Sequence, residues 1–180
     1  ILPAMFITYK YKIVNRFTGT ILGAWFLISG FIPWAVPVFT MPAPEGDFSI
    51  GSETFHWVDS SRLEWFTDEN DNDVREIMVQ AWYPSENSDS IGTNSYMDFM
   101  NLRSKTLASA GKIPAFLPSH LNMISTNTRN DVACSNKLEK YPVLIFSHGI
   151  TGSRHLHQIL FEHLASKGYI VFALDHSFDA

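Results

Sequence analysis

The strongest hydrophobic pattern in the chain lies between residues 141 and 179. It opens with an apolar run at 143–146, too short for a helix, whose β-branched and aromatic side chains favour a strand buried on both faces. A second apolar run follows at 169–174. Between the runs, apolar residues recur at the spacing that lines one helix face: Leu156, Ile159, Leu160 and Leu164. The pattern predicts a βαβ unit, whose two parallel strands belong to an α/β sheet with a right-handed crossover.

Residues at the two ends of the predicted helix indicate its boundaries. Ser153 can cap the start, because a serine oxygen accepts a hydrogen bond from the first free amides of a helix. Gly168 stands where a left-handed residue commonly ends a helix, and the charge of Lys167 suits the negative end. We therefore expect the helix to lie between Ser153 and Gly168.

Alternating apolar and polar positions upstream predict further strands. Residues 54–58 and 62–66 are strand-like and are separated by a turn, and residues 75–83 alternate until Pro84 ends the run. The acidic stretch 67–73 is either a cation loop or a solvated hairpin tip. The tip is favoured, because the stretch lacks the glycine and the closing glutamate of a calcium loop. We expect this block to form antiparallel hairpins at one edge of the parallel sheet.

The segment between these two blocks carries weaker signals. Residues 95–110 are weakly helical, and residues 113–124, with two prolines, predict a second short helix that covers the sheet. Residues 125–140 are polar and predict an exposed connection into the strand at 143–146.

The first forty residues differ from the rest of the chain. Residues 17–39 carry no charge, and as a helix they would extend roughly 35 Å, enough to span the hydrocarbon layer. Lys10, Lys12 and Arg16 precede this run and Glu45 follows it, so the positive-inside rule predicts a cytoplasmic N-terminal side and an outer C-terminal part. A buried helix of a soluble domain is the alternative. It fits less well, because water-soluble helices rarely run so long without a charge.

These features predict three regions along the chain. Residues 1–40 form a membrane segment, residues 41–47 a short proline-containing linker, and residues 48–180 an α/β domain. The chain begins with Ile1 rather than Met and stops just after a predicted strand, so we expect it to be a piece of a longer protein.

Charge and cysteine content narrow the possible partners. All 18 Asp and Glu residues lie after residue 40, with ten of the 13 Lys and Arg residues. No basic stripe suited to a phosphate backbone is present, so nucleic acid is not expected as a partner. The lone cysteine, Cys134, cannot form an internal disulfide, and we interpret it as a packing residue rather than a nucleophile.

Candidate chemistry lies in the loops beyond the carboxyl ends of the two parallel strands, where α/β sheets place their ligand sites. These loops carry residues 147–152 and 175–179. Gly149 and Gly152 leave the backbone room to turn sharply, so that a peptide N–H can point into the crevice. Such an N–H serves either an oxyanion or a phosphate.

The histidines have mainly structural interpretations. His155 and His157 stand two residues apart, and on a helix they would point about 200° from each other and could not share a zinc ion. We expect them, with His163, to face solvent. His148 is expected to organise the turn rather than act as a base, and the pair at 175–176 either lines the crevice or anchors the strand end, with the anchoring role favoured.

At this point several sequence blocks resemble one family, the platelet-activating-factor acetylhydrolases, which are lipoprotein-associated phospholipase A2-like α/β-hydrolases with membrane-tethered microbial relatives. The resemblance covers roughly residues 48–180. It is carried by FHWVD at 55–59, REI at 75–77, QAWYP at 80–84, YP at 141–142, FSHG at 146–149, LASKGYIV at 164–171 and DH at 175–176.

The resemblance implies a serine esterase that hydrolyses short or oxidised acyl esters of phospholipids, with a serine–histidine–aspartate triad and no metal ion or cofactor. It places one oxyanion-hole donor on the backbone N–H of Ile150, with His148 and Gly149 shaping the turn. The second donor is the residue after the nucleophile. Small esters or phospholipids are the implied partners, and the sequence leaves the oligomeric state open.

The nucleophile of such an enzyme is absent from the chain. A nucleophile elbow requires G-x-S-x-G, and no such pattern occurs in the 180 residues. In the family the elbow, the acid and the catalytic histidine follow the part matched here, so we expect this piece alone to be inactive. Two alternatives remain open, a membrane-tethered scaffold without chemistry and a general carboxylesterase.

Overall fold

The computed structural model describes residues 16–67, 70, 72–86, 94–150 and 152–178. Lys10, Lys12 and Thr151 lie outside the described residues. The described chain falls into two compact units, one with α2 and most of α3, the other with the sheet and α4. The elements are the helices α2 (Arg16–Ala35), α3 (Met100–Gly111) and α4 (Gln158–Ser166), the 3₁₀ helix η1 (Pro118–Met123), and the strands β1 (Ser49–Leu63), β2 (Val74–Ser85), β3 (Thr128–Arg129), β4 (Val143–Ser147) and β5 (Ile170–Asp175).

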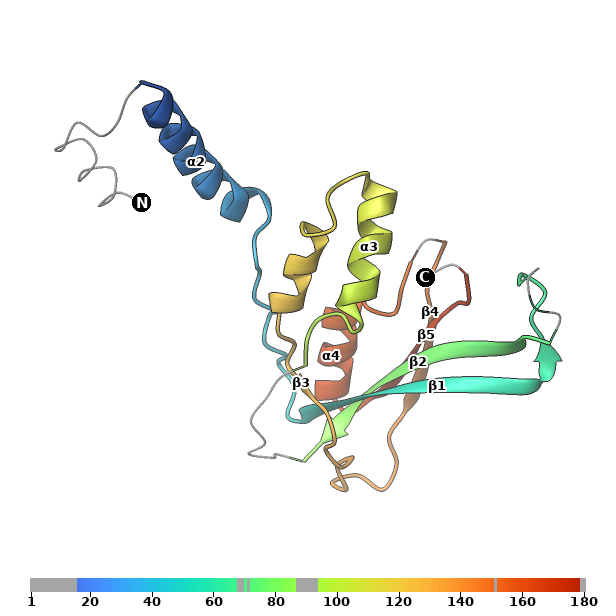
Figure 1. Cartoon of the computed structure of the whole chain (residues 1–180). Coiled ribbons are helices and arrows are strands. Elements are labelled where there is room, and N and C mark those ends of the chain that lie inside the picture. Colours follow the sequence, from blue (N-terminus) through green and yellow to red (C-terminus); the bar gives the residue numbers. More distant parts are fainter. Residues whose placement is uncertain (1–15, 68–69, 71, 87–93, 151, 179–180) are drawn as a thin grey trace. The chain divides into compact units, whose positions relative to one another are not determined.

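The five described strands form one sheet in the order β3-β1-β2-β5-β4. β1 and β2 pair as an antiparallel hairpin, which Figure 1 shows as two long ribbons side by side. β2 pairs with β5 in antiparallel fashion, and β5 pairs with β4 in parallel through the crossover that contains α4. The predicted α/β class is therefore confirmed, with the hairpin next to the parallel pair.

The hairpin is longer than the sequence predicts. β1 is one strand rather than two, and its pairing with β2 shifts between Asp59 and Leu63. The irregularity is local, because Asp59 accepts hydrogen bonds from the amide of Ser61 and from Nε of Arg62. Pro84 does not end β2 as expected. The proline stands opposite Ile50 near the end of the strand, where a missing ladder donor costs least.

The core of the sheet unit lies between α4 and the sheet. Phe161 of α4 packs its ring 5.0 Å from that of Trp82 on β2 and 4.9 Å from that of Phe146 on β4, measured between centroids. The buried residues of this cluster are Ile50, Trp82, Phe161, Ala165, Val171 and Ala173. Because Gln158 and Glu162 are buried on the same helix, the inward face of α4 is partly polar.

The predicted apolar face of α4 is mostly wrong, because only Leu164 of its four residues packs against this cluster. Leu156, Ile159 and Leu160 are about half exposed and border a cavity of about 520 Å³ together with residues 42–45 of the linker. Ser153 is not the cap either, because α4 begins at Gln158 after a series of turns. The prediction for the other end is confirmed, since Gly168 has φ of +95°.

β4 forms where the sequence predicts it, but it is not buried. Ile145 is 75% exposed and Val143 is 54% exposed. The reason is its position, because β4 is the last strand of the described sheet and pairs only with β5. The apolar composition of β4 thus indicates that its exposed side chains pack against a partner, which the described residues do not supply.

The weaker predictions between residues 95 and 140 are partly right. The predicted helix at 95–110 corresponds to α3, and the predicted second helix is the short η1. The connection at 125–140 is less exposed than expected, because it contains β3, whose Thr128 is fully buried and pairs with Ile50 of β1.

α2 is the described helix that can cross a membrane by its length and composition. The qualifying span is Arg16–Trp34, with a mean hydropathy of 1.4 and none of it buried. The helix ends at Ala35, four residues before the end of the predicted span. A signal sequence near an N-terminus has the same length and composition.

Candidate active site

The turn after β4 is closed by a short backbone hydrogen bond. The amide of Gly152 donates to the carbonyl oxygen of Gly149 at 2.9 Å. A methyl group at Gly152 would lie 2.8 Å from that same oxygen and 2.9 Å from Cβ of His148, so the close approach requires glycine there. At Gly149 an added methyl group would meet no atom within 4 Å. The turn is therefore tight on its inner side and open on its outer side.

His148 organises this turn from inside. Its side chain is buried, and Nδ1 lies 2.8 Å from the carbonyl oxygen of Gly149. Its other nitrogen, Nε2, accepts a hydrogen bond of 3.1 Å from the backbone amide of His176. These contacts fit a neutral imidazole with the proton on Nδ1, since a carbonyl oxygen can only accept and an amide can only donate. With both ring nitrogens used, His148 has the geometry of a structural residue rather than a base.

Ile150 lies at the open side of the turn. Its residue surface is 89% exposed, and its backbone N–H has no hydrogen-bond acceptor within the described part of the chain. A free amide on a turn with an anchored backbone can donate to an incoming oxygen atom. An unoccupied backbone donor of this kind is one requirement of an oxyanion hole.

The loop after β5 holds the other predicted residues beside this turn. Nε2 of His176 lies 2.7 Å from the hydroxyl oxygen of Ser147 at the end of β4. The rings of His148 and His176 meet edge to face, with centroids 4.5 Å apart. The structure therefore brings Ser147, His148 and His176 together at the carboxyl ends of the two parallel strands.

Asp175 anchors the strand end, as the sequence analysis favoured. Its Oδ1 accepts a hydrogen bond of 2.7 Å from the backbone amide of Arg154, and its Oδ2 accepts one from the guanidinium of the same residue. The guanidinium also binds Asp98 through Nη2 and Gln80 through Nε at 3.2 Å. Arg154 is fully buried. Sequence reasoning missed Arg154 and Asp98, because no local pattern links positions that are 56 residues apart.

The three histidines expected at the surface behave differently from one another. His155 is buried, and its Nε2 lies 3.3 Å from Oδ1 of Asp98, so the prediction of a solvent-facing side chain is wrong for this residue. His157 is exposed and packs edge to face against the ring of Phe146. His163 is half-buried. No group of three His, Cys, Asp or Glu side chains arranged to hold a metal ion occurs among the described residues.

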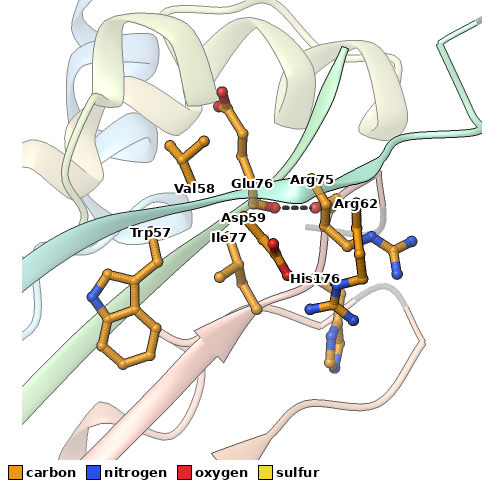
Figure 2. Close-up of a pocket in the computed structure, with 9 residues that line it drawn as sticks. Trp57, Val58, Asp59, Arg62, Arg75, Glu76, Ile77 and His176 are labelled. Carbon is orange, nitrogen blue, oxygen red and sulfur yellow. Dashed lines mark hydrogen bonds and ion pairs between the residues drawn. The ribbon is translucent and has the colours of Figure 1, made fainter. Parts of the chain in front are cut away.

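A cavity of about 400 Å³ borders the loop after β5. Trp57 and Ile77, from paired positions of the hairpin, supply apolar walls. In Figure 2 the side chains of Arg62 and His176 lie at the opposite end from Trp57. The full lining is Trp57, Val58, Asp59, Arg62, Arg75, Glu76, Ile77, His176 and Ser177. Because His176 contacts both Ser147 and His148, the cavity adjoins the residues that lead into the turn.

One carboxylate in this cavity is strongly acidic. Hydrogen bonds from the Ser61 side chain and from the Arg62 guanidinium lower the pKa of Asp59 to about 2. Asp59 therefore keeps its negative charge and its bond to Arg62 over the whole physiological range of pH.

Comparison with known proteins identifies a family and several relatives of the chain. The family model described as platelet-activating factor acetylhydrolase, isoform II, matches residues 36–179. A platelet-activating factor acetylhydrolase from Cavia porcellus is 29% identical over 145 residues, which cover 76% of this chain and 29% of that protein. The solved structure of a ferulic acid esterase from Streptomyces cinnamoneus is similar with a TM-score of 0.63 and 30% identity, over 79% of this chain and 38% of the esterase. The chain thus spans well under half the length of either relative.

Proposed function

Because the chain belongs to the platelet-activating factor acetylhydrolase isoform II family, we propose that it supplies one half of the oxyanion hole of a serine esterase. The observation that carries this proposal is the free amide of Ile150 on an anchored turn at the carboxyl end of β4. The names of the two relatives, an acetylhydrolase and a ferulic acid esterase, support ester hydrolysis as the reaction class.

In the proposed mechanism a serine hydroxyl attacks the ester carbonyl carbon. The carbonyl oxygen becomes negatively charged and accepts a hydrogen bond from the Ile150 amide, while His148 and Gly149 hold the turn in shape. Collapse of the tetrahedral intermediate expels the alcohol, which takes up the proton that the base removed from the serine, and leaves an acyl-enzyme; water then hydrolyses this ester to the free acid and restores the serine. A donor prepared for this oxyanion contributes about 3–4 kcal/mol to the transition state.

We place the nucleophile, the acid and the base of this reaction outside the 180 residues, since the chain contains no G-x-S-x-G. The 180-residue chain is therefore expected not to release p-nitrophenol from p-nitrophenyl acetate above the background rate. The full-length protein is expected to do so and to lose the activity after treatment with a fluorophosphonate. Fluorophosphonate-sensitive turnover by the chain alone would contradict this assignment.

The direct test replaces Ile150 in the full-length protein. Ile150→Pro removes the backbone N–H, and we expect kcat to fall by about 100- to 1,000-fold, the loss that accompanies removal of one oxyanion donor. Ile150→Ala is the matched control, because it keeps the amide and shortens an exposed side chain. If the alanine variant loses as much activity as the proline variant, the amide of Ile150 is not the donor.

For the substrate we propose a phospholipid ester with a short or oxidised acyl chain, which follows from the family. The cavity bordered by His176 has a volume typical of small-molecule sites and is offered as the space for part of this ester. A general carboxylesterase is the second candidate, favoured by the similarity to the ferulic acid esterase. Comparing acetate release from a phospholipid with hydrolysis of ethyl ferulate by the full-length protein distinguishes the two.

We further propose that α2 anchors the domain in a membrane, with the N-terminal side cytoplasmic and the sheet unit outside. The length and composition of α2 support a membrane anchor, and the basic residues Lys10, Lys12 and Arg16 on its N-terminal side support the orientation.

A further inference from the structure

A buried arginine lies a few residues beyond the proposed oxyanion turn. Burial of a guanidinium is costly unless hydrogen bonds and opposite charges replace its water. Arg154 has such partners on three separate segments: Asp175 at the end of β5, Asp98 just before α3 and Gln80 on β2. The side chain is therefore confined to one position, and the backbone that carries it is confined with it.

We propose that Arg154 is the positioning residue of the oxyanion turn, an inference that rests on the esterase function proposed above. The turn is anchored at both of its ends to two consecutive residues, Asp175 at the end of β5 and His176 just after it. At its start, His148 accepts a hydrogen bond from the amide of His176. At its end, both the backbone amide and the guanidinium of Arg154 bind Asp175.

The distance along the chain between these two anchors is short. Residues 149–153 separate them, and the hydrogen bond from the amide of Gly152 to the carbonyl of Gly149 further restricts the backbone conformations of this segment. Release of the Arg154 anchor would leave the turn attached only through β4 and His148. The amide of Ile150 would then sample directions that miss the oxyanion.

The shape of the arginine side chain is important for this role. A guanidinium presents a planar fork of donors, and here its three nitrogens bind three acceptors from different elements. A lysine keeps the positive charge but acts as a single point and cannot reach all three acceptors at once. Arg154→Lys therefore separates loss of geometry from loss of charge.

A misplaced oxyanion donor changes the two kinetic constants differently. The oxyanion exists only in the transition state, so its donor contributes to kcat and little to substrate binding. Misplacement by about 1 Å can lower a rate by roughly 100-fold. For Arg154→Lys in the full-length protein we expect kcat for p-nitrophenyl acetate to fall by about 10- to 100-fold, with KM changed by less than about threefold.

Hydrogen exchange of the same proteins gives a readout that is independent of catalysis. We expect the two hydrogen-bonded amides at this turn, those of positions 152 and 154, to exchange at least about tenfold faster in Arg154→Lys, while the amides of the β1–β2 hairpin remain at the wild-type rate. Arg129→Lys on β3 is the matched control, because it makes the same chemical change outside the turn. Should Arg154→Lys fail to fold, Asp98→Asn, which weakens one partner and keeps the arginine, takes its place.

Each result decides one question. Faster exchange at positions 152 and 154 together with a selective loss of kcat supports the positioning role. Wild-type kcat and wild-type exchange in Arg154→Lys overturn it, as does a rise in KM at constant kcat. If the wild-type protein hydrolyses no ester, the proposed esterase function fails and the catalytic role of Arg154 fails with it. Hydrogen exchange then still decides whether Arg154 holds the turn.

Discussion

At the scale of single residues, the turn depends on the missing side chain of Gly152. For Gly152→Ala we expect the free energy of unfolding to fall by about 1–3 kcal/mol, because the new methyl group would press on the carbonyl of Gly149 and on His148. Gly149→Ala is the control and should change stability by less than about 0.5 kcal/mol, since its methyl group meets no atom within 4 Å. Urea unfolding of the two variants measures both values, and equal losses would contradict the close approach at Gly152.

A second residue-scale prediction concerns Glu162, which is buried on α4. Burial raises its pKa above the ordinary value of 4.5, against the opposing effect of hydrogen bonds from Asn127 and Gln158. The folded state therefore holds a proton more tightly than the unfolded state. The stabilisation that comes from this tighter proton binding is complete below pH 4.5, the pKa of Glu162 in the unfolded chain. It is lost as the pH rises through the higher pKa that Glu162 has in the folded protein.

The measurement compares wild type with Glu162→Gln, which cannot titrate at this position. From about pH 4.5 upward, the unfolding free energy of the wild type should fall relative to that of the variant, by at most about 1.4 kcal/mol per pH unit. Glu53→Gln, a matching change at an exposed position of β1, serves as the control. A constant difference between wild type and Glu162→Gln from pH 4 to 7 would show that burial does not perturb this carboxyl group.

Some residue roles follow from sequence and others require the fold. The turn interpretation of His148 and the anchoring interpretation of Asp175 both follow from position, because the ends of parallel strands meet at one edge of a sheet. The partner of Asp175 does not follow in the same way. Arg154 binds Asp175, Asp98 and Gln80 only after the three segments that carry these acceptors have packed together. No spacing in the sequence predicts these contacts.

At the scale of elements, β4 presents an apolar edge. Unpaired edge strands of this composition attract other strands. We expect the 180-residue chain to associate with itself in mild detergent, and Ile145→Lys to lower the associated fraction, because a charge on the exposed edge opposes strand pairing. Leu102→Lys is the control, being a similarly exposed apolar residue on the helix α3, which offers no strand edge. Light scattering over a range of concentrations measures the association. Equal effects of the two lysines would rule out the β4 edge as the cause.

α4 illustrates the limit of periodicity at this scale. The sequence correctly predicts a helix that ends just before Gly168, since the left-handed residue there is a local requirement. The choice of buried face is not local. Phe161 and Ala165 face the core, whereas Leu156 and Ile159 face the linker. The buried face of the helix also carries the hydrogen-bonded pair Gln158 and Glu162, so its sequence pattern is polar.

At the scale of the whole molecule, the order of strands was predictable in outline. The switch from alternating to continuous apolar runs separates the hairpin from the parallel pair, and the structure joins them through β2 and β5. The long single β1 and the short β3 were not predictable. β1 depends on its pairing with β2, and β3 depends on its pairing with β1, rather than on the residues of either strand alone.

The membrane arrangement can be tested with a residue that the chain already contains. Cys134 is the single cysteine, and it is exposed rather than packed as the sequence predicts, so one label reports the side of the membrane on which the sheet unit lies. Desolvation raises the pKa of its thiol, so a membrane-impermeant maleimide is applied at about pH 8.5 to increase the thiolate fraction. If the N-terminal side is cytoplasmic, intact bacterial cells that express the chain should be labelled at Cys134, and Cys134→Ser should abolish the signal. Labelling that requires lysis of the cells would reverse the orientation.

The same cells distinguish an anchor from a cleaved signal sequence. An α2 anchor keeps the labelled chain at its full mass of 20.4 kDa in the membrane fraction after an alkaline carbonate wash. A cleaved signal releases a shorter labelled product into the soluble fraction, because what remains has no other described helix long and apolar enough to span the bilayer. An additional Leu27→Arg change near the middle of α2 sharpens the comparison. A charge at the centre of a spanning helix costs about 2.5–3.5 kcal/mol, so this variant should lose membrane retention if α2 is the anchor.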